Sequence, residues 1–393
     1  MKKIAIITNT NFTNRKGEAN AALNRIKYLK QEANYEIDVY NLSFYEGFLM
    51  RLFRNTKKYK KITSINIDGI YIKYIWKKFS LLNFIIETKL GFRRLSDNNK
   101  YNDIVNTLKS YDVISAHSSE CGKIALSINE KYGTPYYVTW HGSDIHTRPF
   151  TNKFIKDETV RIMQNASNNF FVSNALLEIS DTLATNANKM ILYNGVSTEF
   201  FEYDAEKKNL IKDMYHIRGK KTIAFIGNLF PIKNVLLLPD IFKSVKNKYR
   251  GELEFWIIGG GKLMDDLKES LDKNNVTCKL WGNQPLDKIP DFMNVIDVLV
   301  LPSKNEGLPL VTIEALSCGA NVVGSNVGGI SEAIGKENTF DLDNNFIENI
   351  SKRIVDMLNN KVEQPLSGLF DWSKTAKKEN EIYMQVLNNK LYE

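Results

Sequence analysis

The stretch from Ser303 to Gly324 reads SKNEGLPLVTIEALSCGANVVG, and the fold prediction works outward from it. An apolar run at 297–302 predicts a buried strand that ends at the edge of this stretch. Asn305–Gly307 then predicts a turn, and Pro309 suits the first position of a helix, where its missing N–H costs nothing. A second apolar run follows at 320–324. Free backbone amides at the helix start, next to a glycine, would suit a phosphate.

The stretch also contains two glutamates, Glu306 and Glu314, eight positions apart. If the segment between them were wholly helical, the step would rise ~12 Å and rotate ~80° away from the same face. The two carboxyls of a retaining glycosidase lie ~5 to 5.5 Å apart. An acid and base pair is therefore not expected. Glu306 is expected to point to the interdomain side, and Glu314 either accepts two ligand hydroxyls or pairs with a lysine or a backbone amide.

Short apolar runs that alternate with helical periodicity continue in both directions from this stretch. Continuous apolarity indicates strands buried on both faces, and alternation with helices indicates parallel βαβ units. The sequence therefore predicts two doubly wound α/β domains, connected by the polar stretch 198–221. The predicted strands are 3–8, 37–42, 112–116, 136–140, 168–173, 190–194, 222–227, 253–260, 278–282, 297–302 and 320–324.

The length of 393 residues and the 43% hydrophobic content are enough for two cores. Three widely spaced cysteines, Cys121, Cys278 and Cys318, indicate buried free thiols in a reducing compartment rather than disulfides. The first apolar run is too short for a signal peptide, and no run approaches the ~18 residues of a spanning helix. A cytoplasmic protein is expected, with possible attachment to the inner face of the cell membrane.

The positive charge of the chain is concentrated in one segment, 51–94. It carries twelve Lys and Arg against two acidic residues, a net charge of +10, whereas the whole chain carries +8. Aromatic and basic residues are interleaved there, as in surfaces that lie on anionic lipid headgroups. An ordinary amphipathic helix packed over the core is the second interpretation. Single-stranded nucleic acid is the third, but no RNA-binding motif accompanies it, so no nucleic acid partner is expected.

Seven ordered motifs give the sequence a specific resemblance. EGLPLVTIEA, CGANVVG and VGGISE follow one another from Glu306 onward, and FIGNLFPIKN, YNGVS and TWHGSDI precede them, with a final FDWSKTAKKENEIYMQVL. This order resembles the retaining nucleotide-sugar glycosyltransferases of family 4, which have the GT-B fold. The resemblance implies two Rossmann-like domains facing across a cleft: an acceptor domain at 1–200 and a donor domain at 201–371, with the terminal helix 372–393 packed back on the first.

The resemblance also implies roles for individual residues. Glu314 would bind the ribose hydroxyls and Glu306 the hydroxyls of the donor sugar, while Lys233 would neutralise the leaving diphosphate. His141 would touch the donor sugar from the first domain, and Asn283 would meet the base. Other donor-binding positions are the phosphate-loop residue Asn228, the helix-start glycine Gly17, and the amides of Gly307, Leu308, Leu310 and Val311.

Asn228 stands where the family usually has an arginine in its phosphate loop. One of two cations is therefore missing from this loop. Arg15, Lys16 and Arg148 are candidate replacements; otherwise Lys233 and the backbone amides alone stabilise the leaving group. The first glycine loop, RKGE, also lacks the second glycine that is common in the family.

The expected function is transfer of a sugar from a nucleotide diphosphate sugar, with a UDP-sugar favoured, to a hydroxyl with retention of configuration. The acceptor is expected to be a glycan or a polyprenyl-linked glycan of cell-envelope or capsular polysaccharide biosynthesis. No cofactor and no metal are expected, since the Asp-Leu-Asp triplet at 341–343 lies after the site motifs. The alternative is a catalytically silent partner of another glycosyltransferase. A nicotinamide dehydrogenase is excluded because no G-x-G-x-x-G follows the first strand.

Overall fold

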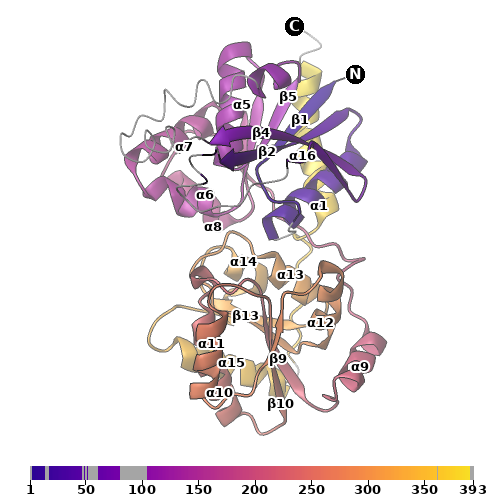
Figure 1. The fold of residues 1–393 in the computed structure, drawn as a ribbon, viewed down its shortest axis with the longest axis vertical. Helices are drawn as coiled ribbons and strands as arrows, with labels where there is room; N and C mark the ends of the chain where they lie inside the picture. The colour runs from indigo at the N-terminus through magenta and orange to yellow at the C-terminus, as the bar shows by residue number, and fades with distance from the viewer. Residues whose placement is uncertain are drawn as a thin grey trace. The chain divides into compact units, whose positions relative to one another are not determined.

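The structure is a computed structural model in which the chain divides into two compact units (Figure 1). The first unit comprises Met1–Val172, Leu177–Leu192 and Ser373–Glu393, and the second comprises Ser173–Leu176 and Tyr193–Trp372. The main segment of the second unit thus begins at Tyr193, ahead of the predicted boundary after residue 200. The structure describes residues 2–13, 17–46, 61–79, 104–360 and 362–389, together with Phe48 and Arg51.

The first unit is built on an eight-stranded sheet in the order β3-β4-β2-β1-β5-β6-β7-β8. All neighbouring strands are parallel except β3 and β4. Every residue of β5 and β6 is buried, as their continuous apolarity predicts. The strands are β1 (Lys3–Thr8), β2 (Glu36–Glu46), β3 (Ser64–Ile67), β4 (Ile70–Phe79), β5 (Val113–His117), β6 (Tyr136–Trp140), β7 (Asn168–Phe171) and β8 (Lys189–Ile191).

Most helices of the first unit connect one strand to the next. The last helix, α16, comes from the C-terminal end of the sequence. In Figure 1 the C-terminal helix α16 lies beside α1, and a buried ion pair between Arg25 of α1 and Glu379 of α16 joins them. The helices are α1 (Gly17–Glu32), α5 (Ser119–Tyr132), α6 (Ser143–His146), the 3₁₀ turn η2 (Arg148–Phe150), α7 (Lys153–Asn165), α8 (Asn174–Asp181) and α16 (Trp372–Asn389).

The basic segment contains a β-hairpin that the sequence analysis did not predict. β3 pairs with β4 in antiparallel fashion, and β4 pairs with β2 in parallel, so the interpretation as an amphipathic helix is wrong for residues 64–79. The missed signal is an alternation with a period of two: Ile70 and Ile72 are buried, whereas Tyr71 is 53% exposed. Residues 52–60 and 80–94 of this segment lie outside the described residues.

The second unit is built on a six-stranded parallel sheet in the order β11-β10-β9-β12-β13-β14. This is the order of a doubly wound nucleotide-binding sheet, whose switch point lies between the first and fourth strands, here β9 and β12. The prediction of two doubly wound parallel sheets is therefore confirmed. The strands are β9 (Lys221–Ile226), β10 (Leu253–Ile258), β11 (Lys279–Gly282), β12 (Val298–Leu301), β13 (Asn321–Ser325) and β14 (Thr339–Phe340).

The helices of the second unit alternate with its strands. They are α9 (Ala205–Met214), α10 (Leu238–Lys248), α11 (Met264–Lys273), α12 (Ile289–Val295), α13 (Leu310–Ser317), α14 (Ile330–Ile334) and α15 (Phe346–Asn360), with 3₁₀ turns η3 (Pro231–Lys233), η4 (Val235–Leu237), η5 (Leu286–Lys288) and η6 (Lys336–Asn338).

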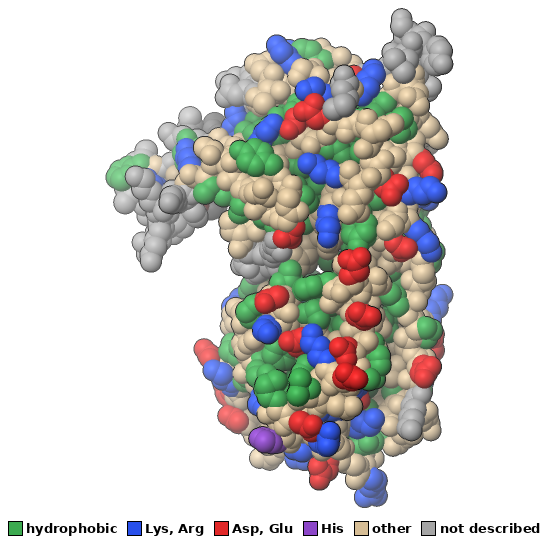
Figure 2. Space-filling model, turned by 90° about the vertical axis from the view of Figure 1, so that its right-hand side faces the viewer, with side chains coloured by type: hydrophobic (Ala, Val, Ile, Leu, Met, Phe, Trp, Pro, Cys, Tyr) green, Lys and Arg blue, Asp and Glu red, His purple; other side chains and the backbone are tan. Residues whose placement is uncertain are grey.

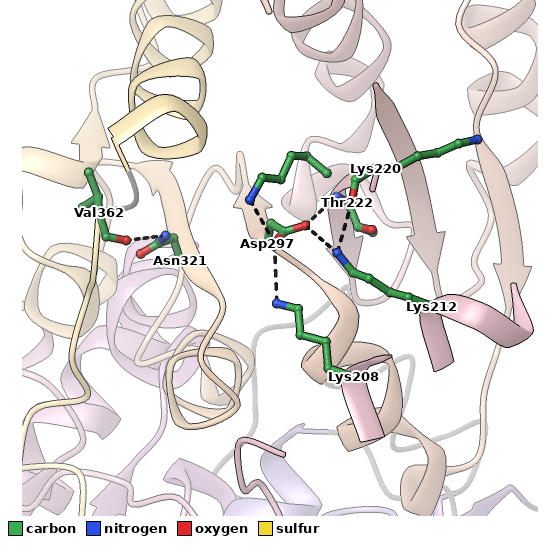
Figure 3. Close-up of polar contacts among 8 residues, drawn as sticks. Lys208, Lys212, Lys220, Thr222, Asp297, Asn321 and Val362 are labelled. Carbon is green, nitrogen blue, oxygen red and sulfur yellow. Dashed lines mark hydrogen bonds and ion pairs between the residues drawn. The ribbon is translucent and has the colours of Figure 1, made fainter. Parts of the chain in front are cut away.

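The stretch 198–221, predicted as a connection between the domains, belongs instead to the second unit. Asp297 joins α9 to the sheet (Figure 3): its carboxylate accepts a hydrogen bond from the Thr222 backbone N–H at 2.9 Å. It also lies 3.3 Å from Lys212 and 3.5 Å from Lys208, both on α9. Burial raises the pKa of Asp297, but these lysines and the Thr222 N–H outweigh it and lower the pKa. The helix is therefore tied to the start of β9.

Charges of both signs are mixed over the described surface on the face that Figure 2 shows, without a large patch of one sign. Such mixing is typical of an ordinary solvated surface. Among the described helices, none combines the length and apolarity needed to cross a membrane.

Candidate active site

The candidate site of the second unit lies at the switch point of its sheet. One loop (227–234) follows β9 and another (302–309) follows β12, so both leave the carboxyl ends of adjacent parallel strands. The backbone N–H of Lys304 donates to the Ile232 carbonyl at 2.8 Å and joins the two loops directly. Ligands of doubly wound sheets bind in this position.

Lys233 and Glu306 come from these two loops and form an ion pair. The Lys233 Nζ lies 2.5 Å from the Glu306 Oε1, and both side chains are largely buried. The same oxygen accepts a hydrogen bond from the Ser303 Oγ at 2.7 Å. Ser303 is fully buried, and its carbonyl accepts from the Ser325 Oγ at 2.5 Å. The sequence analysis missed Ser303, although its position directly after the buried run was a usable signal.

The backbones of two glycines lie in close contact with the turn that carries Glu306. A Cβ on Gly328 would lie 1.8 Å from the Glu306 carbonyl oxygen, and one on Gly329 would lie 2.3 Å from that of Gly307. The Gly329 N–H also donates to the Gly307 carbonyl at 2.9 Å. Only glycine allows backbones to approach this closely. The VGG motif therefore fixes the shape of the Glu306 turn.

The backbone amides between the two glutamates are available to a ligand. The N–H groups of Gly307, Leu308, Leu310 and Val311 donate to no group of the residues that the structure describes. Helix α13 begins at Leu310 after Pro309, so two of these amides belong to its first turn, where N–H groups have no partner within the helix. Such amides, with the positive end of the helix dipole, favour an anion.

Glu314 lies in α13, and its carboxylate forms no hydrogen bond or ion pair with any described residue. The alternative of a carboxylate paired with a lysine or an amide therefore does not apply within the described part of the chain. Burial raises the pKa of Glu314 to about 8. An unpaired acceptor one to two turns into the helix suits a ligand that brings hydroxyl groups.

The remaining donor-site candidates of the second unit lie in neighbouring loops at the same edge of the sheet. Asn228 follows β9, and Asn283 follows β11. The side chain of Asn283 covers Gly260, where a Cβ would lie 2.9 Å from the Asn283 Nδ2. A Cβ on Gly259 would lie 1.9 Å from the Gly227 carbonyl oxygen, so the glycines after β10 allow close packing of two loops. Because β11, β9 and β12 are parallel strands of one sheet, Asn283, Asn228 and Glu306 lie along the edge formed by the carboxyl ends of the strands.

In the first unit, His141 directly follows β6 and is half-buried. Its Nε2 lies 3.1 Å from the Nδ1 of His117, and the two rings stack with centroids 5.3 Å apart. Desolvation, assisted by the positive charge of Arg25, lowers the pKa of His141 to about 3. The His141 ring is therefore neutral at physiological pH. The sequence analysis did not predict this pairing.

The other first-unit candidates have less definite surroundings. Gly17 begins α1, and no described atom lies within 4 Å of the position where its Cβ would be, so sterics alone do not require glycine there. Arg148 donates to the Ser119 Oγ at 3.1 Å. Arg15 and Lys16, the other candidate replacements for the missing arginine, lie outside the described residues.

Residues 206–378 match the model of the family described as "Glycosyl transferases group 1". The match includes Lys233, Glu306, Glu314 and nearly all of the second unit. This segment is therefore similar to the domain that the family model describes.

Sequence similarity to other proteins extends over most of the chain. An uncharacterized glycosyltransferase of Methanocaldococcus jannaschii, MJ1178, is 24% identical over 345 residues, 84% of this chain and 86% of its own. The UDP-Gal:alpha-D-GlcNAc-diphosphoundecaprenol alpha-1,3-galactosyltransferase of Escherichia coli is 26% identical over 312 residues, 72% of this chain and 77% of its own. The chain is thus related to glycosyltransferases in both units.

A solved structure also has a similar fold. Anabaena Alr3699/HepE, solved in complex with UDP and glucose, has a TM-score of 0.72 and 14% identity to this chain. The match covers 98% of this chain and all of that one. At this identity the likeness concerns the fold, and the GT-B prediction is confirmed.

Proposed function

We propose that this protein transfers a sugar from a UDP-sugar to a hydroxyl of a glycan or a lipid-linked glycan, with retention of anomeric configuration and without a metal. The observation that carries the proposal is the Lys233–Glu306 pair at the switch point, next to the unpaired amides at the start of α13. A cation, a carboxylate and an amide cradle are the groups that a sugar diphosphate requires.

The diphosphate would lie against the amides of Gly307, Leu308, Leu310 and Val311. Lys233 would stabilise the negative charge that develops on the leaving diphosphate as the glycosidic bond breaks. To do so, it must exchange its contact with Glu306 for a phosphate oxygen. This exchange leaves the Glu306 carboxylate, still held by Ser303, available to the hydroxyls of the donor sugar.

Glu314 would accept the ribose hydroxyls of the nucleotide, and Asn283 would meet the base. The unpaired carboxylate of Glu314 and the position of Asn283 at the same edge of the sheet support these assignments. His141, a neutral ring, would contact the donor sugar through a hydrogen bond rather than a charge. Asn228 leaves Lys233 and the amides to stabilise the leaving group.

Retention is proposed to proceed without a covalent intermediate. The acceptor oxygen would attack C1 from the face that the diphosphate leaves, so that the new C–O bond forms as the old one breaks. The proton of the acceptor hydroxyl would pass to the departing phosphate oxygen. Glu306 is proposed to bind hydroxyls rather than act as the nucleophile, since it is already paired with Lys233.

UDP is favoured as the nucleotide, and a lipid-linked glycan of cell-envelope or capsular polysaccharide assembly is favoured as the acceptor. The names of similar proteins support both preferences. The name of the Escherichia coli galactosyltransferase includes UDP-Gal and a diphosphoundecaprenol acceptor, and the Anabaena structure was solved with UDP. Contact of segment 51–94 with an anionic membrane stays a prediction. A silent partner subunit is not favoured, because Lys233 and Glu306 are both present and in contact.

A thermal-shift screen tests donor binding, because a ligand that binds only the folded state raises the melting temperature. Wild type, Glu314→Ala and the exposed control Glu269→Ala are measured against UDP-glucose, UDP-galactose, UDP-N-acetylglucosamine, GDP-mannose and ADP-glucose. UDP-sugars are expected to stabilise the wild type and the control, and Glu314→Ala much less. The absence of a shift with every nucleotide sugar, or an equal shift in Glu314→Ala, would contradict the proposed donor site.

A further inference from the structure

The stacked pair of histidines in the first unit has a geometry that simple packing does not require. The ring planes of His117 and His141 differ by 26°, and a nitrogen of one ring lies 3.1 Å from a nitrogen of the other. At this distance one nitrogen donates a hydrogen bond and the other accepts it. A single proton therefore lies between the two rings.

Both rings are neutral, so the hydrogen bond determines where each ring carries its proton. Burial lowers the pKa of His117 well below its usual range, and the neighbouring His141 and the positive charge of Arg25 lower it further. A neutral imidazole carries one proton on two nitrogens. Once the Nε2 of His141 is fixed as donor or acceptor, its Nδ1 has the opposite role.

His117 lies on a strand that buried polar contacts hold in place. Ser115 and His117 lie two residues apart on β5 and so share one face of the sheet. The Ser115 hydroxyl donates a hydrogen bond to the hydroxyl oxygen of Tyr383 of α16 at 2.8 Å. The single proton of the Tyr383 hydroxyl is donated to the Glu379 carboxylate at 2.6 Å. The C-terminal helix therefore packs against this part of β5 through buried polar contacts.

A buried cation lies in the same network. Arg25 is 1% exposed, and its Nε lies 2.6 Å from the Glu379 Oε2. Its two terminal nitrogens are buried without a partner among the described residues. The guanidinium also lies 5.5 Å from the centre of the Phe170 ring. A positive charge held here disfavours a second proton on either histidine.

The turn that carries His141 is fixed from its other side. The Asp144 carboxylate accepts a hydrogen bond from the Gly142 N–H at 2.9 Å. Gly142 has a φ of +157°, a backbone conformation that residues with a side chain rarely adopt. Asp144 is 6% exposed, and its second oxygen is buried without a partner in the described part of the chain. The backbone of His141 is thus fixed by its own turn, and only the ring needs a further contact.

We propose that His117 is a positioning residue for sugar transfer, which sets the tautomer and the ring plane of His141 through the proton that the two rings share. The inference rests on the proposed contact of His141 with the donor sugar. With the tautomer set, His141 offers one defined hydrogen-bonding group, either a donor or an acceptor, instead of a mixture of both. Binding groups that are fixed in advance do not have to be ordered during the reaction.

The direct test is the tautomer of His141, read from the ¹⁵N chemical shifts of its ring in the full-length protein without substrate. The signal is assigned with His141→Gln. The wild type is expected to show one tautomer, and His117→Leu a mixture of both. His117→Asn, whose amide can still bond to the Nε2 of His141, is expected to restore one predominant tautomer. His146→Gln is the matched control, since His146 contacts Thr147 in the same turn and should leave the spectrum of His141 unchanged.

A mixture in the wild type, or an unchanged single tautomer in His117→Leu, would overturn the proposal. Kinetics supply the second readout: His117→Leu is expected to lower kcat by roughly 10-fold to 100-fold with little change in KM, the range expected when an orienting partner is lost. His117→Asn should recover part of this loss, and His146→Gln should match the wild type.

The two readouts separate this inference from the proposed function. A changed tautomer with an unchanged kcat would overturn the role of His117 in transfer, while sugar transfer by the wild type would still stand. If the wild type turned over no nucleotide sugar, the proposed function would fail, and the proposed role in transfer would fail with it. The tautomer measurement would then describe a structural pair only.

Discussion

At the residue scale, the structure separates the two glutamates that the sequence places eight positions apart. Glu306 is paired with Lys233 and Ser303, whereas Glu314 has no partner among the described residues. The sequence analysis predicted that these carboxylates have different roles, and their surroundings differ accordingly. The contact of Glu306 with Lys233 could not be predicted, because it forms only once two loops have been brought together, whereas Ser303 lies in the same loop as Glu306.

Removal of the Lys233 charge is expected to slow the chemical step. Lys233→Met should lower kcat by roughly 100-fold to 1,000-fold, the range for loss of one group that stabilises developing charge. Steady-state rates of UDP release measure this effect. Lys248→Met is the matched control, because Lys248 also pairs with a glutamate of the second unit, Glu348, at 2.7 Å on the surface. Equal losses in both variants would contradict a specific role of Lys233.

The raised pKa of Glu314 predicts a dependence of stability on pH. Between its ordinary value of 4.5 and its folded value of about 8, the folded state holds a proton that the unfolded state has lost. The free energy of unfolding should therefore fall as the pH rises from 5 to 8. Glu314→Gln should remove this part of the fall, at most about 1.4 kcal/mol per unit of pKa shift. Urea unfolding at both pH values measures it, with Glu269→Gln as control; parallel curves for wild type and Glu314→Gln would contradict the assignment.

At the element scale, loops after parallel strands build the candidate site, and glycines determine how closely they approach. Gly259 packs against the loop after β9, and Gly328 packs against the turn after β12. The strand and helix pattern was predictable from the sequence, because buried apolar runs alternate with helical periodicity. The β3–β4 hairpin was not, because its basic residues suggested a surface helix and hid an alternation with a period of two.

Gly328→Ala is expected to disrupt the Glu306 turn. Its φ is +53°, and a Cβ would lie 1.8 Å from a carbonyl oxygen. Gly219→Ala is the matched control, since Gly219 has a φ of +86° but no atom of a described residue within 4 Å of a Cβ. The control should lose about 1–2 kcal/mol from backbone strain alone, and Gly328→Ala should lose more and also fail to bind UDP. Calorimetry of unfolding and of UDP binding measures both; equal losses would show that the close contact has no role.

At the scale of the whole molecule, the sequence predicted two doubly wound sheets, and both are present. It placed the start of the second domain at residue 201, with α9 inside it, whereas the second unit begins at Tyr193. The attachment of α9 to the second unit depends on Asp297, which contacts lysines far from it in sequence, and such contacts leave no local pattern. The contact of α16 with α1 likewise depends on Arg25 and Glu379, which are 354 positions apart. Ordered motifs located the candidate site in the second unit, but the His117–His141 pair required coordinates.

The most direct test of the account is UDP release from the UDP-sugar that gives the largest thermal shift, compared among wild type, Glu306→Gln and the surface control Glu348→Gln. The account predicts that wild type and Glu348→Gln release UDP at equal rates, and that Glu306→Gln is slower by about two orders of magnitude because the donor sugar loses its positioning group. Equal release by wild type and Glu306→Gln, or no release by the wild type from a donor that it binds, would contradict the account and favour the silent partner.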